Sequence, residues 1–167
     1  MNAQFSQLQS SMKLRPGSMA SQVLQFMVAF EQIPVSPLQR IPAEDFKLAE
    51  ALIKEELKEM VVGFEKLETY QSLENLTEFV DGAIDSIYVI LWAMLKFGVP
   101  VDACFAEIQR SNMAKLHNGK VVKYPEGHPK AGKVMKPDSW TAPNLEEILL
   151  EAGDDAVYNS AGFRKDA

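Results

Sequence analysis

Three glutamates stand close together in the stretch EELKE, at Glu55, Glu56 and Glu59. On a helix each residue turns by about 100°, so Glu55 and Glu59 lie about 40° apart and Glu56 about 60° from Glu59. Carboxylates gathered in this way could bind a hard cation such as Mg²⁺. They could equally form a solvated helix face, because Glu and Lys are good helix formers. The stretch alone leaves both interpretations open.

A second acidic group follows at Glu78, Asp81 and Asp85, whose spacing places them within about 60° of one another on a helix. No basic residue occurs between Lys66 and Lys96 to relieve their repulsion. The segment is otherwise apolar, so we expect its acidic end to be partly buried, and buried like charges need a compensating cation. Oxygen ligands without His or Cys predict Mg²⁺, with Mn²⁺ as the other candidate.

Charge is distributed unevenly along the chain. Residues 44–85 hold twelve acidic residues and four lysines, a net charge of −8, whereas residues 115–136 hold six lysines and one glutamate, a net charge of +5. A metal-bound polyphosphate would need both signs, with carboxylates on the cations and lysines on the phosphate oxygens. The near repeat GKVVK at 119–123 and GKVMK at 132–136 predicts two short extended pieces. An ordinary solvated loop is the alternative.

Two polar residues continue an apolar stripe on the helix before this basic segment. Phe105, Ile108, Asn112 and Lys115 lie within about 80° of one another. We therefore expect Asn112 and Lys115 to point inward, where polar groups either are satisfied by the protein or face a ligand.

Apolar periodicity predicts an all-α protein. The expected helices span residues 23–30, 43–67, 75–97, 102–116 and, for a short last helix, 144–153. Asn75 with Glu78, and Asn144 with Glu147, have the spacing of a capping box, and Asp102 is the expected N-cap of the fourth helix.

The remaining segments carry weaker patterns. Residues 1–22 are expected to be a loosely ordered lead-in, 23–153 the single domain, 117–143 an irregular basic loop within it, and 154–167 a tail. The longest apolar run, residues 87–95, is far short of the about 20 residues of a membrane span. A helix so apolar all round needs cover on every side, which predicts a partner subunit.

Composition narrows the class of protein. The chain has 167 residues and a net charge of −6, which argues against general binding of nucleic acid. The single cysteine, Cys104, excludes an internal disulfide framework and fits a reducing compartment. The N-terminal stretch has no apolar segment of the secretory type. We expect a cytoplasmic protein without a membrane partner.

In this order the motifs AFEQIP, EELKE, DSIYVI, RSNMAK and GKVMKPDSW resemble the all-α nucleoside triphosphate pyrophosphohydrolases. They are most similar to the short single-domain MazG-like proteins, including those of bacteriophages, over residues 23–150. The signature of that superfamily is EExxE followed by ExxD. Glu78 and Asp81 match ExxD literally, but the family aspartate directly precedes the apolar-Tyr segment and is here Asp85, with Gly82 three residues before it. Asp81 would then take the place of the missing glutamate.

The resemblance implies a four- to five-helix MazG-like bundle with an irregular basic C-terminal segment, assembled through helices into a homodimer or homotetramer. It implies hydrolysis of a (d)NTP between the α- and β-phosphates to (d)NMP and pyrophosphate. Two or three Mg²⁺ ions would be held by Glu55, Glu56, Glu59, Asp81 and Asp85, with Glu78 a less certain ligand. Glu55 or Glu56 would orient or deprotonate the attacking water.

The substrate would be contacted by residues later in the chain. Asn112 and Lys115 would contact phosphate or sugar, Lys133 and Lys136 would close over the polyphosphate, and Tyr88 would line the nucleotide pocket or else belong to the core. Other interpretations remain open: a narrower enzyme such as a dUTPase, a non-catalytic protein that binds a nucleotide or an alarmone such as ppGpp, and a helical interaction protein. Phe26 and Phe30 are candidates for stacking on a base but fit better as core residues.

Overall fold

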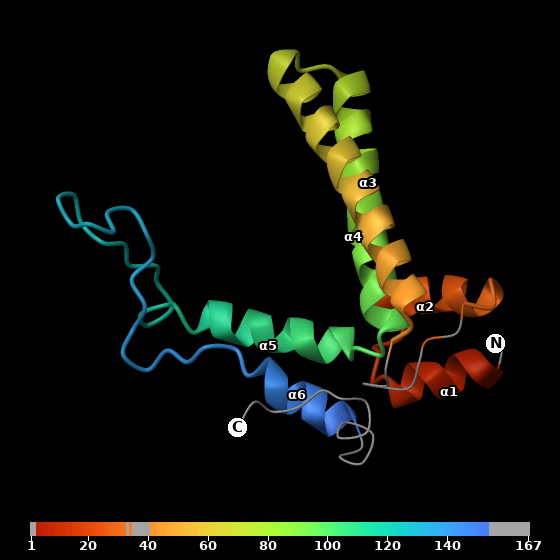
Figure 1. The fold of residues 1–167 in the computed structure, drawn as a ribbon. Coiled ribbons are helices and arrows are strands. Elements are labelled where there is room, and N and C mark those ends of the chain that lie inside the picture. The colour runs from red at the N-terminus through yellow and green to blue at the C-terminus, as the bar shows by residue number, and fades with distance from the viewer. Residues whose placement is uncertain (1–2, 33, 35–40, 154–167) are drawn as a thin grey trace.

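The computed structural model describes residues 3–32, 34 and 41–153, and these residues fold into helices joined by turns and loops, with two isolated β-bridges (Figure 1). The expected all-α fold is confirmed. The six helices of the described residues are α1 (Ala3–Ser11), α2 (Met19–Ala29), α3 (Ala43–Thr69), α4 (Leu73–Lys96), α5 (Val101–Met113) and α6 (Leu145–Ala152).

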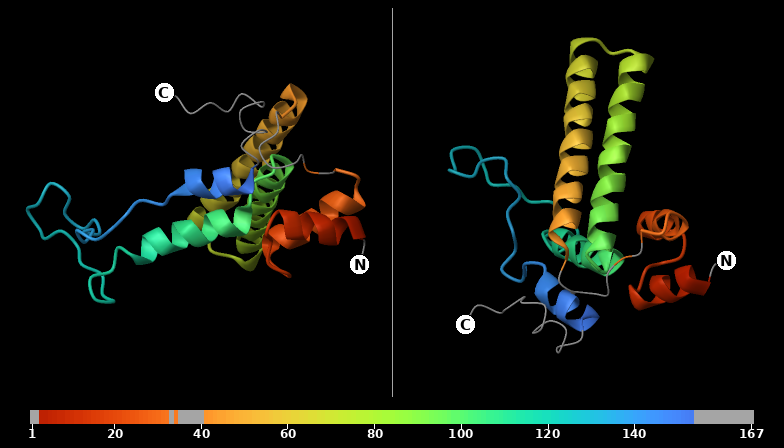
Figure 2. Two further views of the ribbon diagram at one scale, coloured as in Figure 1. Left: turned by 90° about the horizontal axis from the view of Figure 1, so that it is seen from below. Right: turned by 45° about the vertical axis from the view of Figure 1, so that its right-hand side comes forward.

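The two longest helices, α3 and α4, pair along their length as an antiparallel hairpin that rises from the rest of the molecule (Figures 1 and 2). The Ser72 hydroxyl accepts a hydrogen bond from the Asn75 amide and starts α4. The Asn75 side chain instead donates to the carbonyls of Lys66 and Tyr70 at the end of α3. The prediction of Asn75 as the N-cap was therefore wrong, because the same residue closes the preceding helix.

Two glycines allow α3 and α4 to touch backbone to backbone. A Cβ atom at Gly82 would lie 2.7 Å from the backbone nitrogen of Met60, and one at Gly63 would lie 2.8 Å from the Cα atom of Phe79. Only glycine permits so close an approach, since it has no side chain. This contact gives a physical reason for Gly82, where the family pattern would have a glutamate.

The buried core lies at the base of the hairpin. Leu24 and Met27 of α2 and Leu95 of α4 are completely buried there, and Trp92 donates a hydrogen bond from Nε1 to Gln32 Oε1 at 2.8 Å. Packing of α2 and α1 against this end therefore fixes where α4 lies.

Of the expected loosely ordered lead-in at residues 1–22, the described residues 3–22 are instead mostly helical and contribute to the core. Helix α1 and the first turn of α2 lie in this segment, and Phe5, Met12 and Leu14 are buried in the core. Ser18 caps α2 by accepting a hydrogen bond from the Ser21 amide. The apolar residues of α1 are too sparse for a periodic signal, so burial rather than helix propensity accounts for it.

Helix α5 starts and ends earlier than expected, and its buried side differs. Pro100 is the N-cap, and Asp102 Oδ2 accepts from the Arg15 amide at 2.7 Å instead of capping α5. The buried residues of α5 include Cys104 and Ser111, whereas Phe105 is 65% exposed.

Asn112 is exposed as well, so the expected inward orientation of Asn112 and Lys115 was wrong. Their side chains hydrogen-bond each other at 2.7 Å on the surface. A surface pair of this kind remains accessible to a ligand from outside the chain.

The loop after α5 carries the lysine-rich segment of residues 115–136, here called the basic arm. Its two expected extended pieces pair in antiparallel fashion, with the Met135 amide donating to Val122 O at 2.8 Å and the Tyr124 amide donating to Lys133 O at 3.0 Å. Helix α6 follows, and the predicted Asn144 cap is confirmed, since its side chain accepts from the Glu147 amide.

The hairpin exposes a broad apolar face. Counted in helical steps from Gly63 and Gly82, this face lies on the opposite side of the hairpin from Glu59 and Asp81. Its residues are between 37% and 55% exposed: Leu57, Val61 and Phe64 of α3, with Val80, Ile84 and Ile87 of α4. The described part of one chain therefore does not bury the apolar surface of α4 on every side, as the sequence led us to expect of this helix.

Within the described residues no single helix is long and apolar enough to cross a membrane. Only α4 and α5 taken together pass such a test of length and composition, and they are bent by 115° at the break between them.

Replacing Gly82 with alanine tests the close contact. Helix propensity alone would stabilise the variant by about 0.5–1 kcal/mol. We expect the opposite, a loss of about 1–3 kcal/mol of unfolding free energy, because the new Cβ meets the Met60 backbone. Denaturant unfolding measures the change, and Glu68→Ala on the exposed side of α3 is the control. A Gly82→Ala variant as stable as the wild type would contradict the contact.

Candidate functional site

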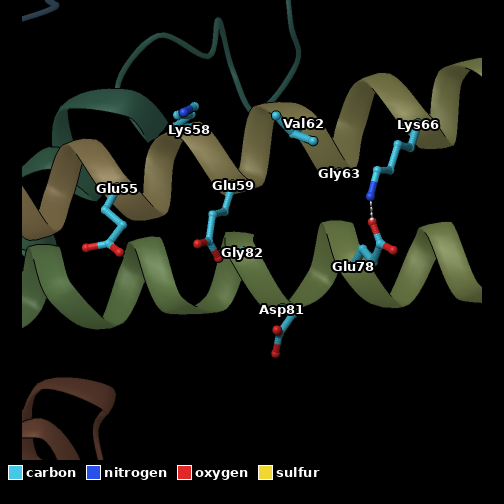
Figure 3. A pocket seen from close by; sticks show the side chains of 9 residues that line it. All are labelled: Glu55, Lys58, Glu59, Val62, Gly63, Lys66, Glu78, Asp81 and Gly82. Atoms are coloured by element: carbon cyan, nitrogen blue, oxygen red, sulfur yellow. Dashed lines mark hydrogen bonds and ion pairs between the residues drawn. The ribbon is translucent and has the colours of Figure 1, made fainter.

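A groove of about 470 Å³ lies between α3 and α4 in the upper part of the hairpin (Figure 3). It is placed by the glycine contact, because the close approach of the helices there lets side chains on one side converge. The groove is lined by Glu55, Lys58, Glu59, Val62, Gly63 and Lys66 of α3 and by Glu78, Asp81 and Gly82 of α4.

The acidic side chains of the groove come from both helices. Figure 3 shows Glu55 and Glu59 pointing from α3 toward α4. Asp81 lines the same groove but its carboxylate points away from α3. Two glutamates of the EELKE stretch and one aspartate of the next helix therefore line the same groove.

The fourth carboxylate, Glu78, has a cation of its own. Its Oε2 atom accepts a hydrogen bond from Lys66 Nζ across the two helices. Glu78 is therefore neutralised by Lys66 at one end of the groove. Among the acidic residues proposed as ligands it is the one with an ion pair in the described structure.

The remaining carboxylates repel one another around Glu56. Partial burial raises the pKa of Glu56 above its usual value, and the negative charges of Glu59, Asp85, Glu55 and Asp81 raise it further. The effect of all four charges on one carboxyl group shows that these residues form a single electrostatic cluster. We call these five residues the acidic cluster.

A buried hydroxyl lies beside this cluster. Ser86 is 3% exposed, and its Oγ atom has no hydrogen-bond partner among the described residues. Because Met60 lies against Gly82 and the helices run antiparallel, one further turn along each helix places Glu56 opposite Ser86. Sequence reasoning missed Ser86, since a single serine on a largely apolar helix carries no signal of its own.

The chemistry of the acidic cluster fits Mg²⁺ or Mn²⁺ in its donor atoms, which are all carboxylate oxygens, and in its uncompensated negative charge. In the conformation described, no group of three or more His, Cys, Asp or Glu side chains among residues 3–32, 34 and 41–153 is arranged to hold a metal ion. The side chains would therefore have to turn inward around a cation. Their roles as ligands remain predictions.

Aromatic side chains flank the cluster. Tyr88 lies one turn beyond Asp85 on α4, and burial raises the pKa of its hydroxyl. Its ring meets the edge of Phe26 at 5.8 Å between centroids, and Phe26 stacks on Phe30 at 4.2 Å. Phe30 is 63% exposed, so the expectation that it belongs to the core was wrong.

The expected substrate-binding residues beyond α4 do not line this groove. Asn112 and Lys115 are bonded to each other on α5, and Lys136 Nζ lies 3.4 Å above the centre of the Trp140 ring. Lys133 is exposed on the basic arm. Figures 1 and 2 show α5 and the arm leading away from the hairpin.

The groove contains two cations that sequence reasoning did not select. Lys58 and Lys66 both line it, and they lie on the same helix as the EELKE glutamates. Lys66 was not selected because a lysine on a charged helix is usually an ordinary surface residue. Its ion pair with Glu78 shows that it reaches across to α4.

The sequence matches one protein family over the part of the chain that builds this site. The model of the phosphoribosyl-ATP pyrophosphohydrolase family matches residues 25–112, which is more than half of the chain and ends before the basic arm. The matched range includes all five residues of the acidic cluster. No curated protein sequence matches the chain closely enough to count as a relative.

The repulsion around Glu56 predicts how stability responds to its removal. Glu56→Gln removes one charge from the acidic cluster, so we expect the metal-free variant to unfold at a higher temperature than the wild type at pH 7. The raised pKa means that the ionised Glu56 destabilises the folded state. The difference should shrink as the pH falls and Glu56 takes up a proton.

The measurement is thermal unfolding against pH in EDTA, with Glu68→Gln as a matched control on the same helix. An equal effect of both substitutions would show that Glu56 is not under special repulsion.

Proposed function

The chain belongs to the phosphoribosyl-ATP pyrophosphohydrolase family of the MazG-like all-α superfamily, and from this premise we propose that it is a Mg²⁺-dependent nucleoside triphosphate pyrophosphohydrolase. Membership makes it a pyrophosphohydrolase with a MazG-like fold. The proposal adds the substrate, a (d)NTP cleaved between its α- and β-phosphates, and the metal. The observation that carries it is the acidic cluster, in which Glu56 has a raised pKa beside four other carboxylates.

The acidic cluster would hold the metal ions through Glu55, Glu56, Glu59, Asp81 and Asp85. When bound, Mg²⁺ would neutralise phosphate charge and activate a water molecule. Mn²⁺ prefers similar oxygen ligands and could replace it. The repulsion that these carboxylates suffer without a cation supports this assignment, since a cation would remove it.

One glutamate of EELKE would take the proton of the attacking water. The water oxygen forms a bond to the α-phosphorus. The bond between the α-phosphorus and the oxygen that bridges to the β-phosphate breaks, and pyrophosphate leaves with that oxygen. Glu56 is one candidate for the base, because the charges of the other four carboxylates of the acidic cluster all act on it. Glu55, which lines the open groove, is the alternative.

Cations and aromatic rings would bind the rest of the nucleotide. Lys66 lines the groove and could leave Glu78 for a phosphate oxygen, which is a stronger partner. Tyr88 and the exposed Phe30 lie beyond the cluster and could meet the base. Stacking on a ring tolerates any base, so this arrangement supports a broad substrate range.

We also propose that the protein is a homo-oligomer assembled through the apolar face of the hairpin. Six large apolar side chains are exposed there on α3 and α4. Two such hairpins packed face to face would form a four-helix bundle, the usual way to cover helices of this kind. A homodimer would suffice, and a homotetramer would double the same contact.

A non-catalytic protein that binds a nucleotide or an alarmone is the second candidate function. It would use the same carboxylates and lysines. Glu78 bonded to Lys66, instead of joining the acidic cluster, is the observation that favours it, because one carboxylate of the literal ExxD is then occupied.

A product assay separates these functions. The purified protein is incubated with Mg²⁺ and each common NTP and dNTP, and with phosphoribosyl-ATP because the family is named for it. We expect NMP and pyrophosphate as products, none with EDTA, and a loss of at least about 100-fold in turnover with Glu56→Gln.

Glu68→Gln is the control and should retain full activity. NDP and phosphate as products would contradict the proposed reaction. Binding of a nucleotide without turnover would favour the non-catalytic function.

The assembly is tested by placing a charge on the apolar face. We expect Val61→Glu to convert the oligomer to a monomer, because a glutamate buried between two hairpins would lack a partner. Light scattering at micromolar concentration measures the mass. Val121→Glu, at a similarly exposed valine of the basic arm, is the matched control. A wild-type protein that is already monomeric at this concentration would refute the assembly.

A further inference from the structure

Lys66 is the cation that crosses the groove. It lines the groove from α3, and its ammonium group bonds Glu78 of α4 on the opposite side. Lys58, the other lysine among the described lining residues, points away from α4 in Figure 3. Lys66 is therefore the lining lysine whose charge lies where a ligand of the groove would meet it.

The bond between Lys66 and Glu78 is open to solvent. The side chain of Lys66 is 50% exposed and that of Glu78 is 43% exposed. An exposed pair of this kind contributes little to stability, because water and salt compete for both charges. A phosphate group offers more charge and more acceptor oxygens than a carboxylate, so it can take over the lysine. Glu78 thus keeps Lys66 over the groove without fixing it there.

The side of the hairpin that carries the groove has a fixed order of chemical groups. Along α4, Asp81 and Asp85 of the acidic cluster lie between Glu78, toward the tip of the hairpin, and Tyr88, toward its base. Their helical positions fall within an arc of about 80°, so all four share one side of α4. This side is therefore aromatic near the base, acidic in the middle and occupied by the Lys66–Glu78 pair toward the tip.

This order sets the direction in which a nucleotide fits. The proposed reaction needs the α-phosphate beside the acidic cluster, where the metal and the attacking water act. With the base against the rings of Tyr88 and Phe30, the β- and γ-phosphates extend toward Lys66. The reverse direction would place the terminal phosphate among aromatic rings and the base beside an ion pair.

The spacing along α3 agrees with this direction. Glu59 and Lys66 are about two turns apart, or about 10 Å along the helix axis. The lysine carries its charge on a flexible stem of four carbons, so it can meet a phosphate that lies between the two positions. When the α-phosphate is held at the acidic cluster, the terminal phosphate of a triphosphate is the one nearest to Lys66.

We propose that Lys66 binds the terminal phosphate of the substrate and that Glu78 competes for the same ammonium group. The inference rests on the proposed function and adds to it a basis for selecting triphosphates over diphosphates. A triphosphate reaches Lys66 and takes it from Glu78, whereas a diphosphate ends short of Lys66 and leaves the ion pair closed. Glu78, the glutamate of the literal ExxD, is then the partner of Lys66 and not a metal ligand.

A double-mutant cycle of Lys66→Ala, Glu78→Gln and the two combined tests the assignment. The kcat/KM of the triphosphate that the product assay ranks first is measured with Mg²⁺, together with the inhibition constant of its diphosphate. We expect Lys66→Ala to lower kcat/KM at least about tenfold, because a charge-assisted hydrogen bond to phosphate is lost. Glu78→Gln should raise kcat/KM about threefold, since the lysine no longer has to leave a carboxylate. The inhibition constant of the diphosphate should not change in either variant.

The double variant shows whether Glu78 acts through Lys66. When Lys66 is already alanine, Glu78→Gln should have no effect on kcat/KM. A gain that persists there would mean that removal of a negative charge alone favours the phosphates, and it would overturn the competition. Loss of activity in Glu78→Gln, as in Glu56→Gln, would make Glu78 a metal ligand and refute the inference. Equal weakening of the triphosphate and the diphosphate by Lys66→Ala would also refute it.

A second ion pair of α3 supplies the matched control. Lys54 bonds Glu50 on the surface of the same helix, and neither residue lines the groove. Lys54→Ala and Glu50→Gln make the same changes of residue type, and both constants should stay at their wild-type values.

Failure of the proposed function would appear differently, as a wild-type protein that turns over no nucleotide. The same variants are then compared by equilibrium binding of dATP and dADP with Mg²⁺. Weaker binding of dATP by Lys66→Ala, with binding of dADP unchanged, would support the inference in the absence of catalysis. A wild type that binds neither nucleotide, or a Lys66→Ala variant that binds dATP as tightly as the wild type, would overturn it.

Discussion

The contact between α3 and α4 at Gly63 and Gly82 is the constraint on which the site depends. Backbone packing at this distance brings the carboxylates of two helices into one electrostatic cluster, and partial burial, together with repulsion by the other four carboxylates, raises the pKa of Glu56. The contact itself is apolar and does not need the charges. Packing elsewhere in the fold thus offsets the repulsion between these carboxylates, so that they stay together and can bind a ligand.

Much of the fold could be predicted where local pattern and tertiary packing agree. The long helices follow from apolar periodicity, and the Asn144 cap was found because nothing competes for its side chain. Prediction failed where a distant partner takes over. The Asn75 side chain donates to carbonyls at the end of the preceding helix, and the Asp102 carboxylate accepts from the Arg15 amide. Helix α1 is stabilised by burial of Phe5 in the core. No local rule contains these partners.

The candidate site was predictable on the side of the carboxylates and less so on the side of the cations. Helical spacing grouped the glutamates of EELKE on one helix and Asp81 with Asp85 on the next, because helical steps are regular, and the family resemblance joined the two groups into one site. The lysines of the site were harder to predict, since whether a lysine can reach the groove depends on which helix or chain its side chain faces. Lys66 was overlooked although it reaches across the groove, while the inward orientation assigned to Lys115 was wrong.

The separated charges and the exposed apolar surface of the described chain both indicate interactions with groups outside the chain. The described chain leaves the carboxylates of the acidic cluster repelling one another, the lysines of the basic arm without an ion pair among the described residues, and six large apolar side chains of the hairpin partly exposed. A second copy packed against the apolar face would cover the six side chains, and a metal-bound polyphosphate would bring cations to the carboxylates and phosphate oxygens to the lysines. Both the cover of the apolar face and the binding of metal and substrate would stabilise the folded chain, so the proposed reaction would take place in the state in which the protein is also most stable.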